Sequence, residues 1–317
     1  MKRLALLLLA ALPASAGTLL VTNKVDATLS FVDTATMKVV ASIPTGEGPH
    51  EVAATADGKL AIVANYGTGP NPGSSLMLVD VRARKELRRI QLPALFRPHG
   101  LAAVGSHIYV TAEGSKTVFR YDAANDRIDW LAGTGQEVSH MVAVTPDERK
   151  VYTANIVSDS VTAFDLADWP RRLKMTQIAT GKGPEGIDVS PDGKEVWAAQ
   201  RGDGGISIID TATDKVTKTL QGGKLPIRLR FTPDGKRVLV NDAPSKEILV
   251  FDAATKELLQ KVAIAEDPVG IVLDDSGQFA YIACTGARKV AALDLAKLEI
   301  TAWVETGEQP DGLAYVK

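Results

Sequence analysis

Three of the four histidines in this chain, together with one glutamate, form a recurring set that suits metal-binding chemistry. His50, His99 and His140 are 49 and 41 residues apart, and Glu185 follows 45 residues after the last of them. Three imidazoles and a carboxylate are ligands that zinc or copper prefers, and three His ligands can leave an open position for catalysis. The sequence therefore predicts metal chemistry if the fold brings these four residues together.

The spacing of these residues follows a repeat of about forty-three residues that is written seven times along the chain. Each repeat contains a short apolar run that ends in Asp, such as LSFVD at 29–33 and ISIID at 206–210. Consecutive members of this Asp series lie 42 to 47 positions apart; they are Asp33, Asp80, Asp122, Asp165, Asp210, Asp252 and Asp294. A period of this size, filled with short strands and turn residues, is typical of β-propeller blades.

One repeat shows how a blade is built and how the ring closes. Residues 181–223 alternate strand-forming runs with turn signals such as Pro-Asp-Gly, which indicates four strands, A to D. The N-terminal region supplies strands B, C and D without an A strand, and the C-terminus supplies a lone A strand from Pro310. We therefore predict an all-β fold, a single domain over 17–317. It is a seven-bladed β-propeller of four-stranded antiparallel blades, with the ring closed by joining the two ends.

The strand B sequences resemble those of the YVTN family of β-propeller repeat proteins. The resemblance is carried by Tyr109-Val110-Thr111, Val21-Thr22-Asn23, Tyr152-Thr153-Ala154-Asn155, the run GPEGIDVSPDGKEVWAAQ at 183–200 and the DTAT turns at Asp33 and Asp210. It covers essentially the whole chain after residue 16. It implies the propeller fold and an exported bacterial protein, but it implies no catalytic residue, because the shared residues are structural.

Two columns of residues around the ring face the same end of the channel. The second residue of strand A reads His50, His99, His140, Glu185, Ile227, Val269 and Asp311. The last residue of strand B reads Asn23, Asn65, Glu113, Asn155, Gln200, Asp242 and Cys284. The first column predicts a metal site of three His with Glu185 as fourth ligand. Alternatively, these His residues only hydrogen-bond to backbone or water. For the second column, bonding to local backbone is favoured over a ligand role.

The N-terminus predicts the location of the protein, and the composition excludes some classes of function. Met1-Lys2-Arg3, an apolar run and Ala14-Ser15-Ala16 predict a signal peptide over 1–16, cleaved after Ala16, and hence a periplasmic or secreted protein. The apolar run is too short for a membrane anchor. A net charge of −2 with mixed signs does not suit nucleic-acid binding. A longer loop at 66–75 is either a lid over the His residues or a tolerated insertion.

These observations leave three hypotheses about function. The first is a periplasmic binding protein that holds a transition-metal ion such as zinc or copper, or a metal-bearing cofactor or small ligand, at the channel mouth. The second is a non-catalytic scaffold for a protein partner, with an inert channel. The third is a lactonase-like hydrolase, in which an open metal position activates water. No Ser-His-Asp or paired-carboxylate arrangement is evident, so an enzyme is the less favoured class.

Overall fold

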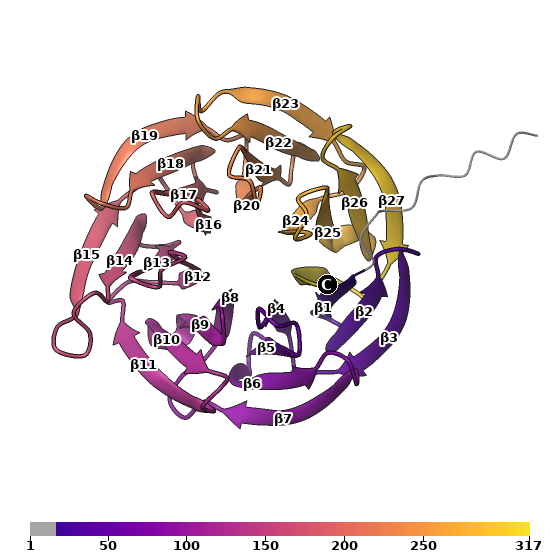
Figure 1. Cartoon of the computed structure of the whole chain (residues 1–317), viewed down its shortest axis with the longest axis horizontal. Helices are drawn as coiled ribbons and strands as arrows, with labels where there is room; N and C mark the ends of the chain where they lie inside the picture. The colour runs from indigo at the N-terminus through magenta and orange to yellow at the C-terminus, as the bar shows by residue number, and fades with distance from the viewer. Residues whose placement is uncertain (1–16) are drawn as a thin grey trace, which may run out of the picture.

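The computed structural model describes residues 17–317, which form seven antiparallel four-stranded sheets arranged as blades around a central channel (Figure 1). This confirms the predicted fold. In each blade the strands run outward from strand A, beside the channel, through B and C to D. We call the end of the channel where the A strands begin the His end, and the opposite end, where the A–B turns lie, the turn end. The predicted signal peptide, 1–16, lies outside the described residues.

The first four blades follow one another along the chain. Blade 1 consists of β4 (Pro49–Ala54), β5 (Leu60–Gly67), β6 (Pro72–Asp80) and β7 (Lys85–Gln91). Blade 2 consists of β8 (Pro98–Val104), β9 (His107–Ala112), β10 (Thr117–Asp122) and β11 (Arg127–Gly133). Blade 3 consists of β12 (Ser139–Val144), β13 (Lys150–Asn155), β14 (Ser160–Asp165) and β15 (Lys174–Ala179). Blade 4 consists of β16 (Pro184–Val189), β17 (Glu195–Gln200), β18 (Gly205–Asp210) and β19 (Lys215–Gln221).

The remaining blades complete the ring. Blade 5 consists of β20 (Pro226–Phe231), β21 (Arg237–Asp242), β22 (Glu247–Asp252) and β23 (Leu258–Ala263). Blade 6 consists of β24 (Pro268–Leu273), β25 (Phe279–Cys284), β26 (Lys289–Asp294) and β27 (Glu299–Glu305). Blade 7 consists of β28 (Pro310–Val316), β1 (Thr18–Asn23), β2 (Thr28–Asp33) and β3 (Lys38–Pro44). Two short 3₁₀ helices, η1 (Glu113–Ser115) and η2 (Thr285–Ala287), follow β9 and β25. Within 17–317, no helix has the length and apolar character to cross a bilayer.

Blade 7 joins the two ends of the chain, as predicted. β28 pairs antiparallel with β1, with Tyr315 opposite Leu19 and Leu313 opposite Val21. The innermost strand of this blade therefore comes from the C-terminus and its other three strands from the N-terminal region (Figure 1). Because β1 has a partner on each side, this closure leaves no open sheet edge where the ends of the chain meet.

The seven repeated Asp residues cap the turns between strands C and D. In each blade the Asp carboxylate accepts a hydrogen bond from a backbone N–H two or three residues later; the acceptors are Asp33, Asp80, Asp122, Asp165, Asp210, Asp252 and Asp294. An Asp side chain in this position mimics a backbone turn. The structure thus confirms that this series builds the blades.

Apolar side chains pack between neighbouring blades and hold the ring rigid. One cluster joins Ile62 and Leu78 of blade 1 to Leu101 and Val110 of blade 2. Alternating residues of each inner strand point to opposite faces of the sheet, so each blade packs against both of its neighbours. The strand starts at the His end are therefore held in fixed positions.

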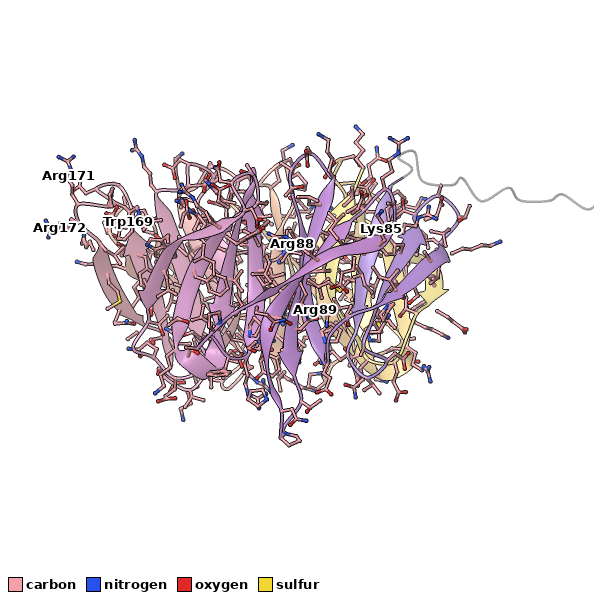
Figure 2. The ribbon with its side chains drawn as sticks, turned by 90° about the horizontal axis from the view of Figure 1, so that it is seen from below. Lys85, Arg88, Arg89, Trp169, Arg171 and Arg172 are labelled. Atoms are coloured by element: carbon pink, nitrogen blue, oxygen red, sulfur yellow. The ribbon has the colours of Figure 1, made fainter. Side chains whose placement is uncertain are left out.

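The outer D strands carry charged residues on their exposed side. Lys85, Arg88 and Arg89 lie on β7 (Figure 2), which is the edge strand of blade 1. Charged side chains on an edge strand discourage pairing with another chain. The C–D loop of blade 3 is longer and carries Trp169 and Arg171 at the rim of the disc (Figure 2).

Candidate metal centre at the channel mouth

An irregularity in strand pairing directs side chains of the A strands toward the channel axis. On β4 the register with β5 shifts between Pro49 and Val52, so that His50 and Glu51 together lie opposite Ala64. The register shifts at the start of strand A in all seven blades. Bulges of this kind re-aim side chains and often lie beside functional sites. The predicted column of second residues therefore converges at the His end.

Threonines of the B strands fix two of the histidines from the neighbouring blade. The Thr22 hydroxyl donates to the His50 carbonyl at 2.8 Å, and the Thr111 hydroxyl donates to the His140 carbonyl at 2.6 Å. Thr111 also accepts a hydrogen bond of 2.8 Å from the N–H of Gly100. A Cβ at Gly100 would lie 2.5 Å from the His140 carbonyl oxygen, so only glycine permits this close approach of β8 and β12.

The three imidazoles form a continuous group on adjacent blades. The ring centroids of His50 and His99 are 4.7 Å apart, and those of His99 and His140 are 3.8 Å apart. His99, in the middle, is 1% exposed. Its Nδ1 atom is buried and has no hydrogen-bond partner among the described residues. A buried nitrogen without a partner is costly and uncommon, so this atom of His99 calls for an explanation.

A carboxylate from Glu113, the first residue of η1, completes the group. Oε1 of Glu113 contacts Nδ1 of His140, and Oε2 accepts a hydrogen bond of 2.6 Å from the Tyr66 hydroxyl. The Tyr66 ring also packs against His50, with centroids 4.4 Å apart. Arg97 also lies over the Tyr66 ring, 4.9 Å from its centroid. Tyr66 thus covers the imidazoles and anchors Glu113.

The three imidazoles differ in protonation state because burial and nearby carboxylates act on them differently. Burial lowers the pKa of His50 to about 4 and lowers the pKa of His99 well below its ordinary value. Burial also acts to lower the pKa of His140, but its contacts with Glu113 and Glu185 outweigh burial and raise the pKa to about 9. At neutral pH the site therefore contains two neutral imidazoles beside one imidazolium.

Glu185 lies in the same group but is held mainly by arginines. One of its oxygens lies 3.5 Å from His140 Nε2 and 3.1 Å from Arg228, and the other lies 2.9 Å from Arg201. Burial acts to raise the pKa of Glu185, but these positive neighbours outweigh it and lower the pKa to about 2. Glu185 is therefore an ionised carboxylate that balances cations at this end of the channel.

Arg228 crosses the channel beneath the imidazoles. From β20 its guanidinium donates to Glu185 at 3.1 Å and, on the other side, to Glu51 of β4 at 3.0 Å. β4 and β20 are separated in the ring by β24 and β28, so this bridge spans the axis (Figure 1). Arg228 is 4% exposed. A planar guanidinium that pairs with carboxylates on two sides closes the channel at this level.

A further ion-paired group borders the histidines on the blade 7 side. The Asp311 carboxylate lies 3.4 Å from His50 Nδ1 and 3.2 Å from Lys24 Nζ. Burial acts to raise the pKa of Asp311, but Lys24, His50 and Arg228 outweigh it and lower the pKa. Asp311 is therefore an ionised carboxylate beside the His50 ring, and Lys24 neutralises its charge.

One combination of side chains has spacing that suits a metal ion. A ligand atom from each of His99, Glu113 and His140 lies within 4.8 Å of the other two. Zinc–nitrogen and zinc–oxygen bonds are about 2.0–2.2 Å, so three ligands around one ion lie roughly 3–4 Å apart. A modest inward movement of these side chains would bring all three to bonding distance.

The structure therefore places the four residues predicted from sequence in one site but in different settings. His50, His99 and His140 lie together at the His end, as their shared column predicts. Glu185 lies beside His140, with its carboxylate directed at Arg201 and Arg228.

Two further side chains of the site come from positions that were not predicted to be metal ligands. The sequence predicts Glu113 as the last residue of strand B, in the second column, with bonding to local backbone favoured. This placement is wrong by one residue: β9 ends at Ala112, which pairs with Pro98 as Asn65 pairs with Pro49, and Glu113 is the first residue of η1. An acidic residue directly after a B strand was the available signal. Tyr66 is the first residue of the longer 66–75 loop, which extends the β5–β6 hairpin. An aromatic residue at the root of a loop over the histidines is a signal that could have been used.

A second group of possible ligands, His107, Asp122 and Asp129, lies in blade 2. Its members are already engaged. His107 Nδ1 contacts Glu148 at 2.6 Å, and Asp129 accepts two hydrogen bonds from Arg120 at 2.8 and 2.9 Å. Asp122 caps its turn. These partners satisfy the group without an ion.

The blades, the closure and the polar channel mouth define the class of this protein as a seven-bladed β-propeller with a histidine-lined site. The sequence of residues 150–315 matches the family described as YNCE-like beta-propeller, and the chain belongs to this family. A search of curated proteins gave no match.

Several solved structures share the fold. A functionally unknown protein from Desulfotomaculum acetoxidans is 14% identical, with 95% of this chain and 99% of that chain covered and a TM-score of 0.81. Apo AztD from Citrobacter koseri is 11% identical, with coverage of 96% and 98% and a TM-score of 0.71. A chain of hydrazine synthase from Kuenenia stuttgartiensis is 20% identical, with coverage of 84% and 89% and a TM-score of 0.69. At these identities the likeness concerns the fold alone.

Proposed function

We propose that this propeller binds one transition-metal ion at its His end, through His99, His140 and Glu113. The observation that carries the proposal is that one ligand atom from each of these residues lies within 4.8 Å of the other two, while the buried Nδ1 of His99 has no hydrogen-bond partner among the described residues. A metal ion would satisfy this nitrogen. Two imidazoles and a carboxylate suit zinc or copper.

The surroundings of the three proposed ligands support this function. Tyr66 hydrogen-bonds the second oxygen of Glu113, which is the kind of outer contact that orients a metal ligand. His50 lies against His99 and is held by Asp311, so it is available as a further ligand or as a neighbour that excludes water. The imidazolium of His140 must lose its proton when a metal binds.

We also propose that the protein acts outside the cytoplasm, after removal of residues 1–16. The N-terminal pattern supports this location, and Gly17, the first residue of the proposed mature chain, is hydrogen-bonded to Thr34 in blade 7. The function is then to hold a metal ion in an exported compartment.

Calorimetric titration with Zn²⁺ and Cu²⁺ tests the metal site. The wild-type chain is compared with His99→Ala and with the control His107→Ala, which removes an imidazole outside the site. Loss of an outer contact to a ligand weakens metal binding by about 10–100-fold, so loss of a ligand should weaken it by more than about 100-fold. We expect this loss in His99→Ala and unchanged affinity in His107→Ala. Equal binding by the two variants, or no binding by the wild-type protein, would overturn the proposal.

A further inference from the structure

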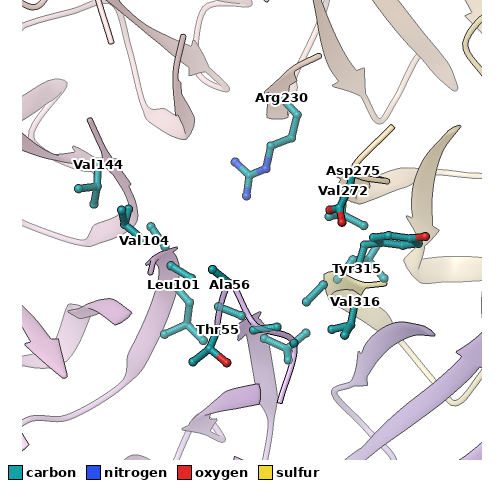
Figure 3. A pocket seen from close by; sticks show the side chains of 18 of the residues that line it. Thr55, Ala56, Leu101, Val104, Val144, Arg230, Val272, Asp275, Tyr315 and Val316 are labelled. Carbon is teal, nitrogen blue, oxygen red and sulfur yellow. The ribbon is translucent and has the colours of Figure 1, made fainter. Parts of the chain in front are cut away.

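The turn end of the channel contains a pocket that is separate from the metal centre. Its volume is about 440 Å³, within the range of roughly 300–1,000 Å³ that small-molecule sites occupy. It is formed by the ends of the A strands and the A–B turns that follow them (Figure 3). Arg228, two residues before Arg230 on β20, lies between this pocket and the histidines.

The walls of this pocket combine apolar side chains with charged side chains and exposed backbone groups. The apolar side chains include Ala56, Leu101, Val104, Val144, Val272 and Val316. This part of the wall gains free energy, at roughly 25 cal/mol per Å², when an apolar group displaces water from it. A ligand that has both an apolar part and a polar group therefore suits these walls.

Arg230 provides a charged group directed into this pocket (Figure 3). Its contacts all involve one nitrogen. Nη1 lies 3.8 Å from the Asp188 carboxylate, and it donates long hydrogen bonds of 3.5 and 3.4 Å to the carbonyls of Ile187 and Leu229. No described residue accepts a hydrogen bond from Nε or Nη2. The edge formed by these two nitrogens is the fork that binds a carboxylate through two parallel hydrogen bonds.

The other charged groups at the pocket leave this edge of Arg230 available. The Asp188 carboxylate accepts a hydrogen bond of 2.9 Å from the Phe231 N–H, so it is held by backbone as well as by its loose contact with Nη1. Asp57 is paired with Lys59. Asp275 and Lys317 are the remaining charged residues that line the pocket, and they carry opposite charges.

We infer that the turn-end pocket binds a small organic carboxylate with an apolar body, with the carboxylate on the free edge of Arg230. The apolar body would lie against Leu101, Val104 and Val144. Because the bridge made by Arg228 separates the two ends of the channel, this site is independent of metal binding at the His end.

Calorimetric titration with benzoate and hexanoate, each paired with its neutral amide, tests this inference. The probes are applied to the wild-type chain, to Arg230→Gln and to Arg230→Lys, with His99→Ala as the control for the other end of the channel. We expect both carboxylates to bind with dissociation constants of about 1 mM or lower, and their amides to bind at least about tenfold more weakly. Arg230→Gln should lose at least about tenfold in carboxylate affinity, and His99→Ala should lose none.

Arg230→Lys distinguishes the contribution of the paired N–H groups of arginine from the contribution of its positive charge. Lysine keeps the positive charge but lacks the planar pair of N–H groups, so we expect carboxylate affinity between those of the wild-type protein and Arg230→Gln. Equal binding of acids and amides, unchanged affinity in Arg230→Gln when circular dichroism shows it folded, or no binding by either carboxylate would overturn the inference.

Discussion

The Tyr66 hydroxyl donates a 2.6 Å hydrogen bond to Glu113, which contacts His140 through its other oxygen. The three residues come from three consecutive blades. Tyr66 makes two kinds of contact. Its ring packs against His50, and its hydroxyl holds the Glu113 carboxylate. Blade 1 thus reaches over blade 2 to set the geometry of a ligand that faces blade 3.

Tyr66→Phe should weaken metal binding about tenfold, because the Glu113 carboxylate loses the contact that orients it. The ring, and with it the packing against His50, is kept. Tyr109→Phe is a matched control, since the Tyr109 hydroxyl also donates to a glutamate, Glu148, at 2.8 Å, but away from the site. Metal titration of the two variants should separate them; equal affinities would show that Tyr66 does not position Glu113.

Deleting Asp311–Lys317 should destabilise the protein severely. These residues form nearly all of β28, the inner strand of blade 7, and their loss exposes the edge of β1. We expect aggregation or a large drop in Tm, measured by differential scanning calorimetry. Deletion of Lys317 alone, which lies beyond the strand, should leave Tm unchanged. A full-length Tm in the longer deletion would contradict the closure.

Export should leave a mature chain that begins at Gly17. The basic start, apolar run and Ala14-Ser15-Ala16 motif predict this cleavage. Intact-mass measurement on the periplasmic fraction of an expressing Gram-negative cell is the check, and Ala16→Pro provides a variant that should block processing. Unprocessed wild-type chain in the cytoplasm would refute the assignment.

The repeat predicted the fold and the meeting of the histidines because both depend on local strand patterns. The seven Asp residues occupy equivalent turns, and His50, His99 and His140 occupy equivalent strand positions. The correct strand assignment of one blade therefore predicts the positions of these residues in every blade. The second column matches its prediction only in part. Asn65 accepts a hydrogen bond from the Gly46 N–H, and Asp242 accepts two from Lys224 and Leu225. These backbone donors lie 17 to 19 positions earlier in the chain, not in the local turn, and Asn155 bonds to side chains instead.

The remaining parts of the site depend on where long side chains reach, which a repeat does not encode. Arg228 pairs with Glu51, 177 positions away, across the channel axis. Glu185 turns to Arg201 and Arg228 rather than acting only as a partner of His140. Both outcomes follow from the balance of charges in a buried space, and that balance depends on residues from several blades.

Arg228→Met should lower the free energy of unfolding by about 3–5 kcal/mol, because Glu51 and Glu185 would lose a buried partner. Arg201→Met is the control. Arg201 pairs with the same Glu185, but its side chain is 45% exposed, so we expect a loss of about 1 kcal/mol or less. Urea unfolding followed by circular dichroism measures both. Similar losses in the two variants would show that the bridge across the channel does not hold the blades together.

Neighbouring imidazoles should make stability depend on pH in opposite directions. The pKa of His50 is lowered to about 4, so the unfolded chain binds a proton at higher pH than the folded chain does. His50 therefore destabilises the fold as pH falls from about 6.5 to 4. His50→Gln should reduce this loss when unfolding is measured by urea titration in the presence of a chelator. An unchanged acid limb would contradict the assignment of a neutral, buried His50.

His140 should make the free energy of unfolding depend on pH in the alkaline range. Its pKa in the folded protein is about 9, against an ordinary value of 6.5, so the folded chain holds the proton more tightly than the unfolded chain. The resulting stabilisation is fully present below about pH 6.5 and is lost as pH rises through about 9. His140→Gln should therefore flatten the decline in unfolding free energy between these values in metal-free protein, whereas His50→Gln should leave it in place. A decline that persists in His140→Gln would show that Glu113 and Glu185 do not hold an imidazolium between them.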